Sequence, residues 1–124
     1  MLRLIIGLPN SGKSSYAERF PNVIHYDDYL GNPEEVRQAA YKAAGGDVTI
    51  EGIYNTVAAR RTVLDAVDTD RRICIWLDTP PEECARRENR GRSQLLHRMH
   101  QRRFEPPTPD EGWDEIIVVT PEET

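Results

Sequence analysis

Residues 7–14, with the sequence GLPNSGKS, leave this chain few possible folds. They match the pattern G-x-x-x-x-G-K-[ST] at every position, and glycines in that pattern let backbone N–H groups surround a phosphate. An apolar run, Leu2–Ile6, precedes this phosphate loop, and a helix-compatible stretch, Ser15–Phe20, follows it. Strand, loop and helix in this order are the setting that the motif requires. We therefore expect a nucleoside triphosphate site here, rather than a glycine-rich turn that binds nothing.

The motif gives two of its side chains a chemical role. Lys13 is expected to reach the β and γ phosphates, and the Ser14 hydroxyl is expected to hold Mg²⁺. The expected cofactors are therefore ATP, as phosphate donor, and Mg²⁺. The residues expected to contact the nucleotide in and beside the loop are Gly7, Pro9, Asn10, Ser11, Gly12, Lys13, Ser14 and Ser15.

Composition limits the class of protein. With 124 residues, of which 38% are hydrophobic and 30% charged, the chain is expected to form one globular domain over residues 1–124. No apolar run reaches the ~18–20 residues that span a membrane, and no leader-like segment opens the chain, so a cytoplasmic location is expected. Cys74 and Cys84 are not spaced for a metal site, and we interpret them as reduced packing residues.

Charge is distributed unevenly along the chain. The net charge of −5 argues against a general nucleic-acid-binding surface. Between Arg86 and Arg103, however, seven arginines accompany a single acid, Glu88. The sequence leaves two interpretations of this segment open: a patch that faces phosphates, or a solvated helix face.

Strand-like and helix-like segments alternate. Strands are expected at residues 2–6, 22–26, 47–51, 72–77 and 115–119. Helices are expected at residues 15–20, 32–44, 56–67, 79–91 and from 94 onward. Thr79 is expected to open a capping box, and Ser93 to cap the last helix. This alternation predicts an α/β domain with a mainly parallel sheet.

Carboxylates follow three of the expected strands. Asp27 and Asp28 come after the second strand, Glu51 ends the third, and Asp78 follows the fourth. Ligands of parallel sheets bind beyond the carboxyl ends of the strands, where a carboxylate can hold Mg²⁺ through water or accept a proton from a hydroxyl. Aspartates also end strands because they favour turns. The phosphate loop on the same sheet strengthens the functional interpretation of Asp27 and Glu51.

Four parts of the chain together resemble one family. The first is the phosphate loop, the second is residues 26–31 (YDDYLG), and the third is residues 48–55 (VTIEGIYN). The fourth is the stretch from Arg86 onward, which contains residues 86–91 (RRENRG) and 104–113 (FEPPTPDEGW). On these motifs the chain resembles the kinase domain of polynucleotide 5′-hydroxyl kinases, within the small P-loop kinases. Residues 104–113 are similar to the segment before the last strand of the animal-type enzymes. They form the most specific of these motifs, since the phosphate loop alone does not select this family.

The resemblance implies a fold and a set of roles. The fold is the three-layer P-loop NTPase fold, with five strands in the order 2-3-1-4-5 and an arginine-rich helical lid at about residues 79–103. Asp27 takes the place of the family's general base, and Arg90, with Arg86, that of lid arginines on the ATP phosphates. Glu51 replaces the family's Asp and would hold Mg²⁺ through water. The implied catalytic residues are Asp27, Lys13 and Arg90, and the implied partner is a DNA or RNA 5′-hydroxyl end.

One departure from the family keeps the acceptor open. Leu30 stands where the phage-type enzymes carry an arginine for the substrate phosphate, although the animal-type pattern also has Leu-Gly there. Two alternatives therefore remain beside a polynucleotide kinase. One is a small-molecule kinase that acts on a nucleoside, sugar or antibiotic hydroxyl. The other is a non-catalytic module that binds ATP and acts as a switch.

Overall fold

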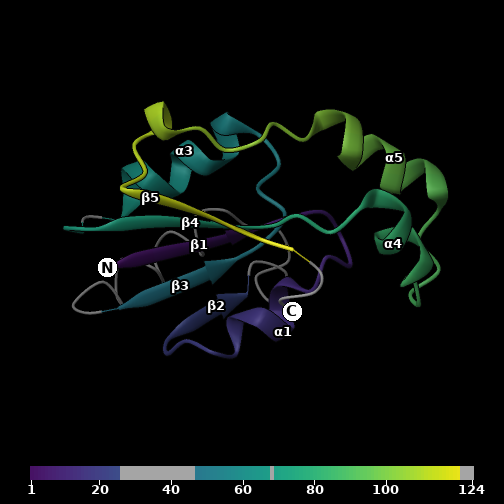
Figure 1. Ribbon diagram of the computed structural model, residues 1–124, viewed down its shortest axis with the longest axis horizontal. Coiled ribbons are helices and arrows are strands. Elements are labelled where there is room, and N and C mark those ends of the chain that lie inside the picture. The colour runs from purple at the N-terminus through teal and green to yellow at the C-terminus, as the bar shows by residue number, and fades with distance from the viewer. Residues whose placement is uncertain (26–46, 68, 121–124) are drawn as a thin grey trace.

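The computed structural model describes residues 1–25, 47–67 and 69–120 (Figure 1). The helix expected at residues 32–44 lies outside these ranges, and so do Asp27, Asp28 and Leu30. In the described ranges, each of the expected strands is present within two residues of its expected limits.

A parallel sheet forms the centre of the molecule. Its strands are β1 (Leu2–Ile6), β2 (Val23–His25), β3 (Val48–Glu51), β4 (Arg72–Leu77) and β5 (Glu115–Val119). Their order is β2-β3-β1-β4-β5, and every neighbouring pair is parallel. The central strands are apolar on both faces, as expected when helices cover both sides. The predicted strand order and parallel direction are confirmed.

Two hydrophobic clusters show that the sheet has a helical layer on each face. Helix α3 (Val57–Ala66) and helix α1 (Lys13–Ala17) lie on opposite sides of it (Figure 1). Alternate residues of β1 point to opposite sides, because side chains of a strand alternate. The α3 side buries Leu2, Leu4, Ile6, Val48, Ile50, Val63, Leu64, Val67, Cys74 and Trp113. The α1 side buries Ile5, Ala17, Ile73, Ile75, Leu77 and Val119. The α/β three-layer architecture is therefore confirmed.

Residues 79–103, which we expected to form a lid and continue to call the lid, lie beyond the carboxyl ends of the strands. The lid contains α4 (Pro81–Arg86) and α5 (Gln94–Arg103), which pack against each other at the end of the sheet to which β4 and β5 point (Figure 1). The Ser93 hydroxyl accepts a hydrogen bond from the Leu96 amide at 3.1 Å, so the predicted cap of α5 is confirmed. This position puts the lid over the edge where parallel sheets bind ligands.

The predicted capping box at Thr79 is wrong, and so is the predicted end of that helix. Pro80, not Thr79, is the N-cap of α4, and the helix ends at Arg86 instead of continuing to residue 91. The Thr79 hydroxyl donates to the carbonyl of Ser11 at 2.9 Å and is buried. Thr79 therefore supports the phosphate loop rather than its own helix.

A buried ion pair fixes the segment from Phe104 to Trp113. Arg60 of α3 is 0% exposed, and its Nε donates to the Glu111 carboxylate at 2.8 Å. The same guanidinium donates to the carbonyls of Tyr54 and Glu105, both at 2.9 Å. Glu111 belongs to the short 3₁₀ helix η2 (Pro109–Glu111) and also accepts from Trp113 Nε1 at 3.3 Å. Each of the three guanidinium nitrogens of Arg60 thus donates to at least one partner, as a buried charge requires.

No helix in the described part of the chain is long and apolar enough to cross a membrane.

Candidate nucleotide site

The phosphate loop connects β1 to α1 and has the backbone geometry of an anion cradle. Gly12 adopts φ 99°, a left-handed value that side chains disfavour. At Gly7 a Cβ atom would lie 2.5 Å from Ser11 Oγ and 3.1 Å from the carbonyl oxygen of Leu77, so no larger residue fits without a shift. Ser11 Oγ is itself buried and finds no hydrogen-bond partner among the described residues. Both glycines of the motif are therefore required by the fold of the loop.

Lys13 lies at the start of α1 with its ammonium over the loop. It is 9% exposed, and Nζ donates to the carbonyls of Gly7 at 3.1 Å and Leu8 at 2.8 Å. These hydrogen bonds hold the positive charge of Lys13 beside backbone N–H groups that can donate to a bound anion. An ammonium and a ring of N–H groups are together the donor set that phosphates favour.

Ser14 and Glu51 come together from α1 and the end of β3. The Ser14 hydroxyl donates to Glu51 Oε1 at 3.3 Å, and Nδ1 of His25 lies 3.1 Å from the same oxygen. Glu51 is only 3% exposed, whereas Ser14 is exposed. A hydroxyl and a carboxylate are hard oxygen ligands, so this pair fits Mg²⁺. In the described residues, no group of three or more His, Cys, Asp or Glu side chains forms a metal site by itself.

A pocket joins the phosphate loop to the lid. Its lining comes from the loop and α1, the end of β3, and the segment between α4 and α5: Pro9, Asn10, Gly12, Lys13, Ser14, Ser15, Glu51, Gly52, Ile53, Arg90 and Arg92. Most of the residues expected in the nucleotide site are thus brought to one place. Arg92 joins them, although the sequence did not single it out.

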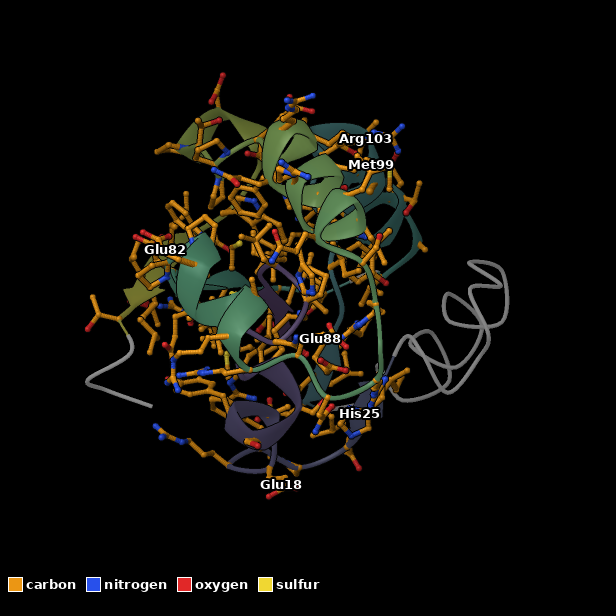
Figure 2. The ribbon with its side chains drawn as sticks, turned by 90° about the vertical axis from the view of Figure 1, so that its right-hand side faces the viewer. Glu18, His25, Glu82, Glu88, Met99 and Arg103 are labelled. Carbon is orange, nitrogen blue, oxygen red and sulfur yellow. The ribbon has the colours of Figure 1, made fainter. Side chains whose placement is uncertain are left out.

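Glu88 links the lid to the loop. Its Oε1 accepts from Asn10 Nδ2 at 3.1 Å and from Arg92 Nε at 2.9 Å, and it lies 2.7 Å from His97 Nε2. Its Oε2 accepts from the backbone amides of Arg90 at 2.8 Å and Arg92 at 3.2 Å. Figure 2 looks onto this end of the molecule, with Glu88 near the centre of the view. One carboxylate therefore shapes the turn that carries both pocket arginines.

The hydrogen bonds of Glu88 also control its charge. Desolvation alone would raise its pKa, but the bonds from the Arg90 amide, His97, the Arg92 amide and Asn10 outweigh it and lower the pKa to about 2. Asn10 adds a direct hydrogen bond between the phosphate loop and the lid, because its Oδ1 accepts from the Arg92 guanidinium at 2.6 Å. The loop and the lid are consequently joined by an ionised carboxylate at neutral pH.

Arg86 lies away from this pocket. Its guanidinium is exposed and pairs with the carboxylate of Glu83, one turn earlier in α4. Arg87, the next residue, also pairs with Glu83 and donates to the carbonyl of Asn10 at 3.2 Å. The side-chain hydrogen bonds from Arg86 and Arg87 lower the pKa of Glu83 to about 2. Of the two lid arginines expected at the phosphates, only Arg90 lines the pocket.

Sequence reasoning missed Glu88, Arg92, His25 and His97. The signal for Glu88 was its isolation, since it is the single acid among seven arginines. Phe104 stacks on Trp76, with ring centroids 5.3 Å apart, and Trp113 is buried, so both aromatic rings pack against the core. Cys74 and Cys84 are buried and free; burial raises the pKa of both thiols, that of Cys74 to about 12.

No protein-family model and no curated protein matches this chain. Solved structures do match it. Kti12 of Chaetomium thermophilum, in complex with ADP-AlF3, has a TM-score of 0.70 at 14% identity, over 100% of this chain and 91% of that one. An unliganded sugar kinase from a Janibacter species has a TM-score of 0.71 at 16% identity, over 99% and 86% of the two chains.

A gluconokinase from Sinorhizobium meliloti matches with a TM-score of 0.64 at 15% identity, over 95% of this chain and 81% of that one. At such identities the likeness concerns the fold alone. The chain has the fold of P-loop kinases, in agreement with its strand order and its phosphate loop.

Proposed function

We propose that this chain, with its P-loop kinase fold, transfers the γ-phosphoryl group of ATP to the 5′-hydroxyl of a polynucleotide end. The observation that carries the proposal is the single pocket in which the phosphate loop, Glu51 and the lid arginines meet. A phosphate-binding protein needs only the loop. A phosphotransferase also needs cations that neutralise the charge of the transferred group, and Arg90 and Arg92 supply them.

The donor half of the site consists of the loop, Lys13 and the lid arginines. The backbone amides of residues 10–14 bind the β phosphate, and Lys13 bridges the β and γ phosphates. Arg90 contacts the γ phosphate from the lid, and Arg92, held by Glu88 and Asn10, supports the same side. Since phosphoryl transfer depends mostly on positioning and electrostatics, loss of Lys13 or Arg90 would lower the rate by on the order of 10²–10⁵.

The Ser14 hydroxyl and, through water, Glu51 would hold Mg²⁺. When bound, it neutralises negative charge on the phosphates. His25 contacts Glu51 from a second side, since its Nδ1 lies 3.1 Å from Glu51 Oε1. It orients the carboxylate toward Ser14.

Asp27 is the proposed base. It lies outside the described residues, and its role rests on the sequence resemblance of residues 26–31. The attacking hydroxyl gives its proton to the Asp27 carboxylate while its oxygen forms a bond to the γ phosphorus. The bond from that phosphorus to the β–γ bridging oxygen breaks, and ADP leaves with the electron pair.

Residues 104–113 support a polynucleotide acceptor, because they resemble the animal-type polynucleotide kinases. A small-molecule acceptor is the second candidate. It is supported by Leu30 and by the net charge of −5. Two of the structures that share this fold are a sugar kinase and a gluconokinase.

An acceptor panel separates the two candidates. The protein is incubated with ATP labelled at the γ phosphate and with single-stranded DNA, recessed DNA or RNA ends that carry a 5′-hydroxyl, beside gluconate, hexoses and deoxynucleosides. The same oligonucleotides with a 5′-phosphate are the control. Label on the 5′-hydroxyl oligonucleotides, absent from the control, is the expected result. Label on a small molecule alone would establish the second candidate and reject the first.

A further inference from the structure

The outer face of α5 carries positive charge that the donor half of the site does not use. Residues 86–103 hold seven arginines and one acid, a formal charge of +6. The rest of the chain holds nine cationic and twenty acidic side chains, a formal charge of −11. So strong a separation places nearly all excess positive charge on the lid. A concentration of positive charge on one segment of an acidic protein creates a local field that attracts anionic ligands.

The arginines of α5 are not consumed by internal ion pairs. Arg86, Arg87 and Arg92 pair with Glu83 or Glu88. Within the described ranges, Arg98, Arg102 and Arg103 make no hydrogen bond or ion pair, and all three are exposed. Their guanidinium groups are therefore available to an anionic ligand without the breakage of an existing bond.

These arginines share a surface. Arg98, Arg102 and Arg103 line one hollow with Leu95 and Met99, as the spacing of three and four residues on a helix requires. Met99 and Arg103 lie on the side of α5 away from α4 (Figure 2). Leu95 is 70% exposed, and none of the residues of α5 is buried. We call this surface, with its five residues, the α5 face.

The α5 face follows the nucleotide pocket closely along the chain. Arg90 and Arg92 line the pocket, and α5 begins two residues after Arg92. A ten-residue helix is about 15 Å long, which matches roughly two or three phosphates of an extended strand. We propose that the α5 face binds the phosphate backbone of the single-stranded polynucleotide whose 5′ end is the acceptor.

This inference rests on the proposed function for the identity of the acceptor. An acidic protein is the other polyanion that could bind here. Protein interfaces usually bury a core of apolar and aromatic side chains, whereas this face offers only Leu95 and Met99 between its arginines. Three exposed cations within six residues, with few apolar neighbours, are better matched by a polymer with one charge per unit.

The test measures oligonucleotide binding without catalysis. The binding of a fluorescent 12-nucleotide DNA with a 5′-hydroxyl is followed at several salt concentrations for the wild type and for the triple variant Arg98→Gln, Arg102→Gln, Arg103→Gln. The control removes three exposed arginines elsewhere, in the variant Arg19→Gln, Arg61→Gln, Arg71→Gln. Both variants have the same net charge, so a difference reports position. Circular dichroism checks that both are folded.

The α5 variant is expected to bind the oligonucleotide at least tenfold more weakly than the control. Loss of three phosphate contacts on a single strand should reduce the slope of log K against log salt by about 2. The affinity for ATP should be unchanged in both variants. Equal binding by the two variants would overturn the inference, and so would a polyglutamate peptide that binds the wild type more tightly than the DNA does.

Failure of the proposed function gives a different result. Label transfer from ATP to a dinucleotide, which is too short to reach along α5, reports the reaction alone. If the wild type phosphorylates the dinucleotide and the 12-nucleotide DNA equally well and the α5 variant does the same, the function stands and the inference is wrong. If the wild type binds DNA through the α5 face but phosphorylates neither, the function is wrong and the inference stands.

Discussion

The side-chain amide of Asn10 donates to the carboxylate of Glu88 at 3.1 Å, across 78 residues of sequence. Asn10 belongs to the phosphate loop and Glu88 to the lid. The same amide donates to the carbonyl of Cys84 at 3.0 Å, so the loop is tied to two points around the end of α4. This connection holds Arg90 and Arg92 beside the loop without help from a ligand contact. Such preorganisation lowers the entropic cost of assembling a phosphate site.

Substitution Glu88→Gln should weaken ATP binding. The carboxylate accepts bonds from Asn10, Arg92 and two backbone amides, and a glutamine would turn one of its oxygens into a donor facing donors. Hydrogen bonds to a charged group are stronger than those between neutral groups. We expect KM for ATP to rise by on the order of tenfold. Steady-state kinetics measure it, with Glu82→Gln, an exposed change on α4, as the control.

A purely structural role for Glu88 would give another pattern. In that case the free energy of unfolding would fall while KM for ATP stayed at the wild-type value. Conversely, a rise in KM of equal size in Glu82→Gln would show that the lid responds to any loss of negative charge.

The stabilising effect of Glu88 should disappear in acid. Its folded-state pKa is about 2, below the ordinary value of 4.5. A depressed carboxyl pKa stabilises the fold fully above the unfolded value and loses this effect as pH falls toward the folded value. The difference in denaturation midpoint between wild type and Glu88→Gln should therefore be constant above about pH 5 and shrink between about pH 4.5 and 2. A difference independent of pH would argue against an ionised Glu88.

Substitution Gly7→Ala should disrupt the phosphate loop. The new Cβ would lie 2.5 Å from Ser11 Oγ, and overpacking of this kind costs about 1–3 kcal/mol. We expect the Kd for ATP, measured by isothermal titration calorimetry, to rise by about tenfold or more. The double variant Gly7→Ala, Ser11→Ala removes the clashing hydroxyl and should recover part of the affinity. No recovery would mean that the Leu77 carbonyl, at 3.1 Å, is the limiting contact.

Substitution Arg60→Leu should destabilise the fold strongly. It leaves the Glu111 carboxylate, which is 4% exposed, without its cation. Breaking a buried pair in this way costs about 3–5 kcal/mol, whereas an exposed pair contributes about 0–1 kcal/mol. Arg71→Gln breaks the exposed pair with Glu115 and is the control. Urea denaturation of both variants measures the two losses, and equal losses would contradict the role of the buried pair.

Much of the fold could be predicted from sequence because its signals are local. The phosphate loop, the apolar runs of the strands and the cap at Ser93 each depend on neighbouring residues. The strand order came from the resemblance, and it agrees with the sheet. The place of Glu51 at the carboxyl edge also followed from the strand pattern. Its contacts with Ser14 and His25 agree with that expectation.

Several of the contacts that sequence reasoning missed are made between distant segments. Thr79 fitted the local pattern of a capping box, yet its hydroxyl donates to Ser11, 68 residues earlier. Arg60 lies at helical spacing from the core residues Val63 and Leu64, but only tertiary packing provides its partner Glu111. Glu88 likewise has its role through Asn10. The local sequence around a polar helix residue does not identify a hydrogen-bond partner that lies far away in the chain.

The central claim is that this site transfers phosphate, and single-turnover transfer from ATP to a 5′-hydroxyl oligonucleotide tests it most directly. Wild type and Asp27→Asn are compared, with the Kd for ATP measured on the same samples. We predict equal ATP affinity, label on the oligonucleotide with the wild type, and transfer at least about 100-fold slower in Asp27→Asn, as loss of a general base requires. ATP binding by the wild type without transfer to any acceptor, or equal transfer by both proteins, would contradict this account.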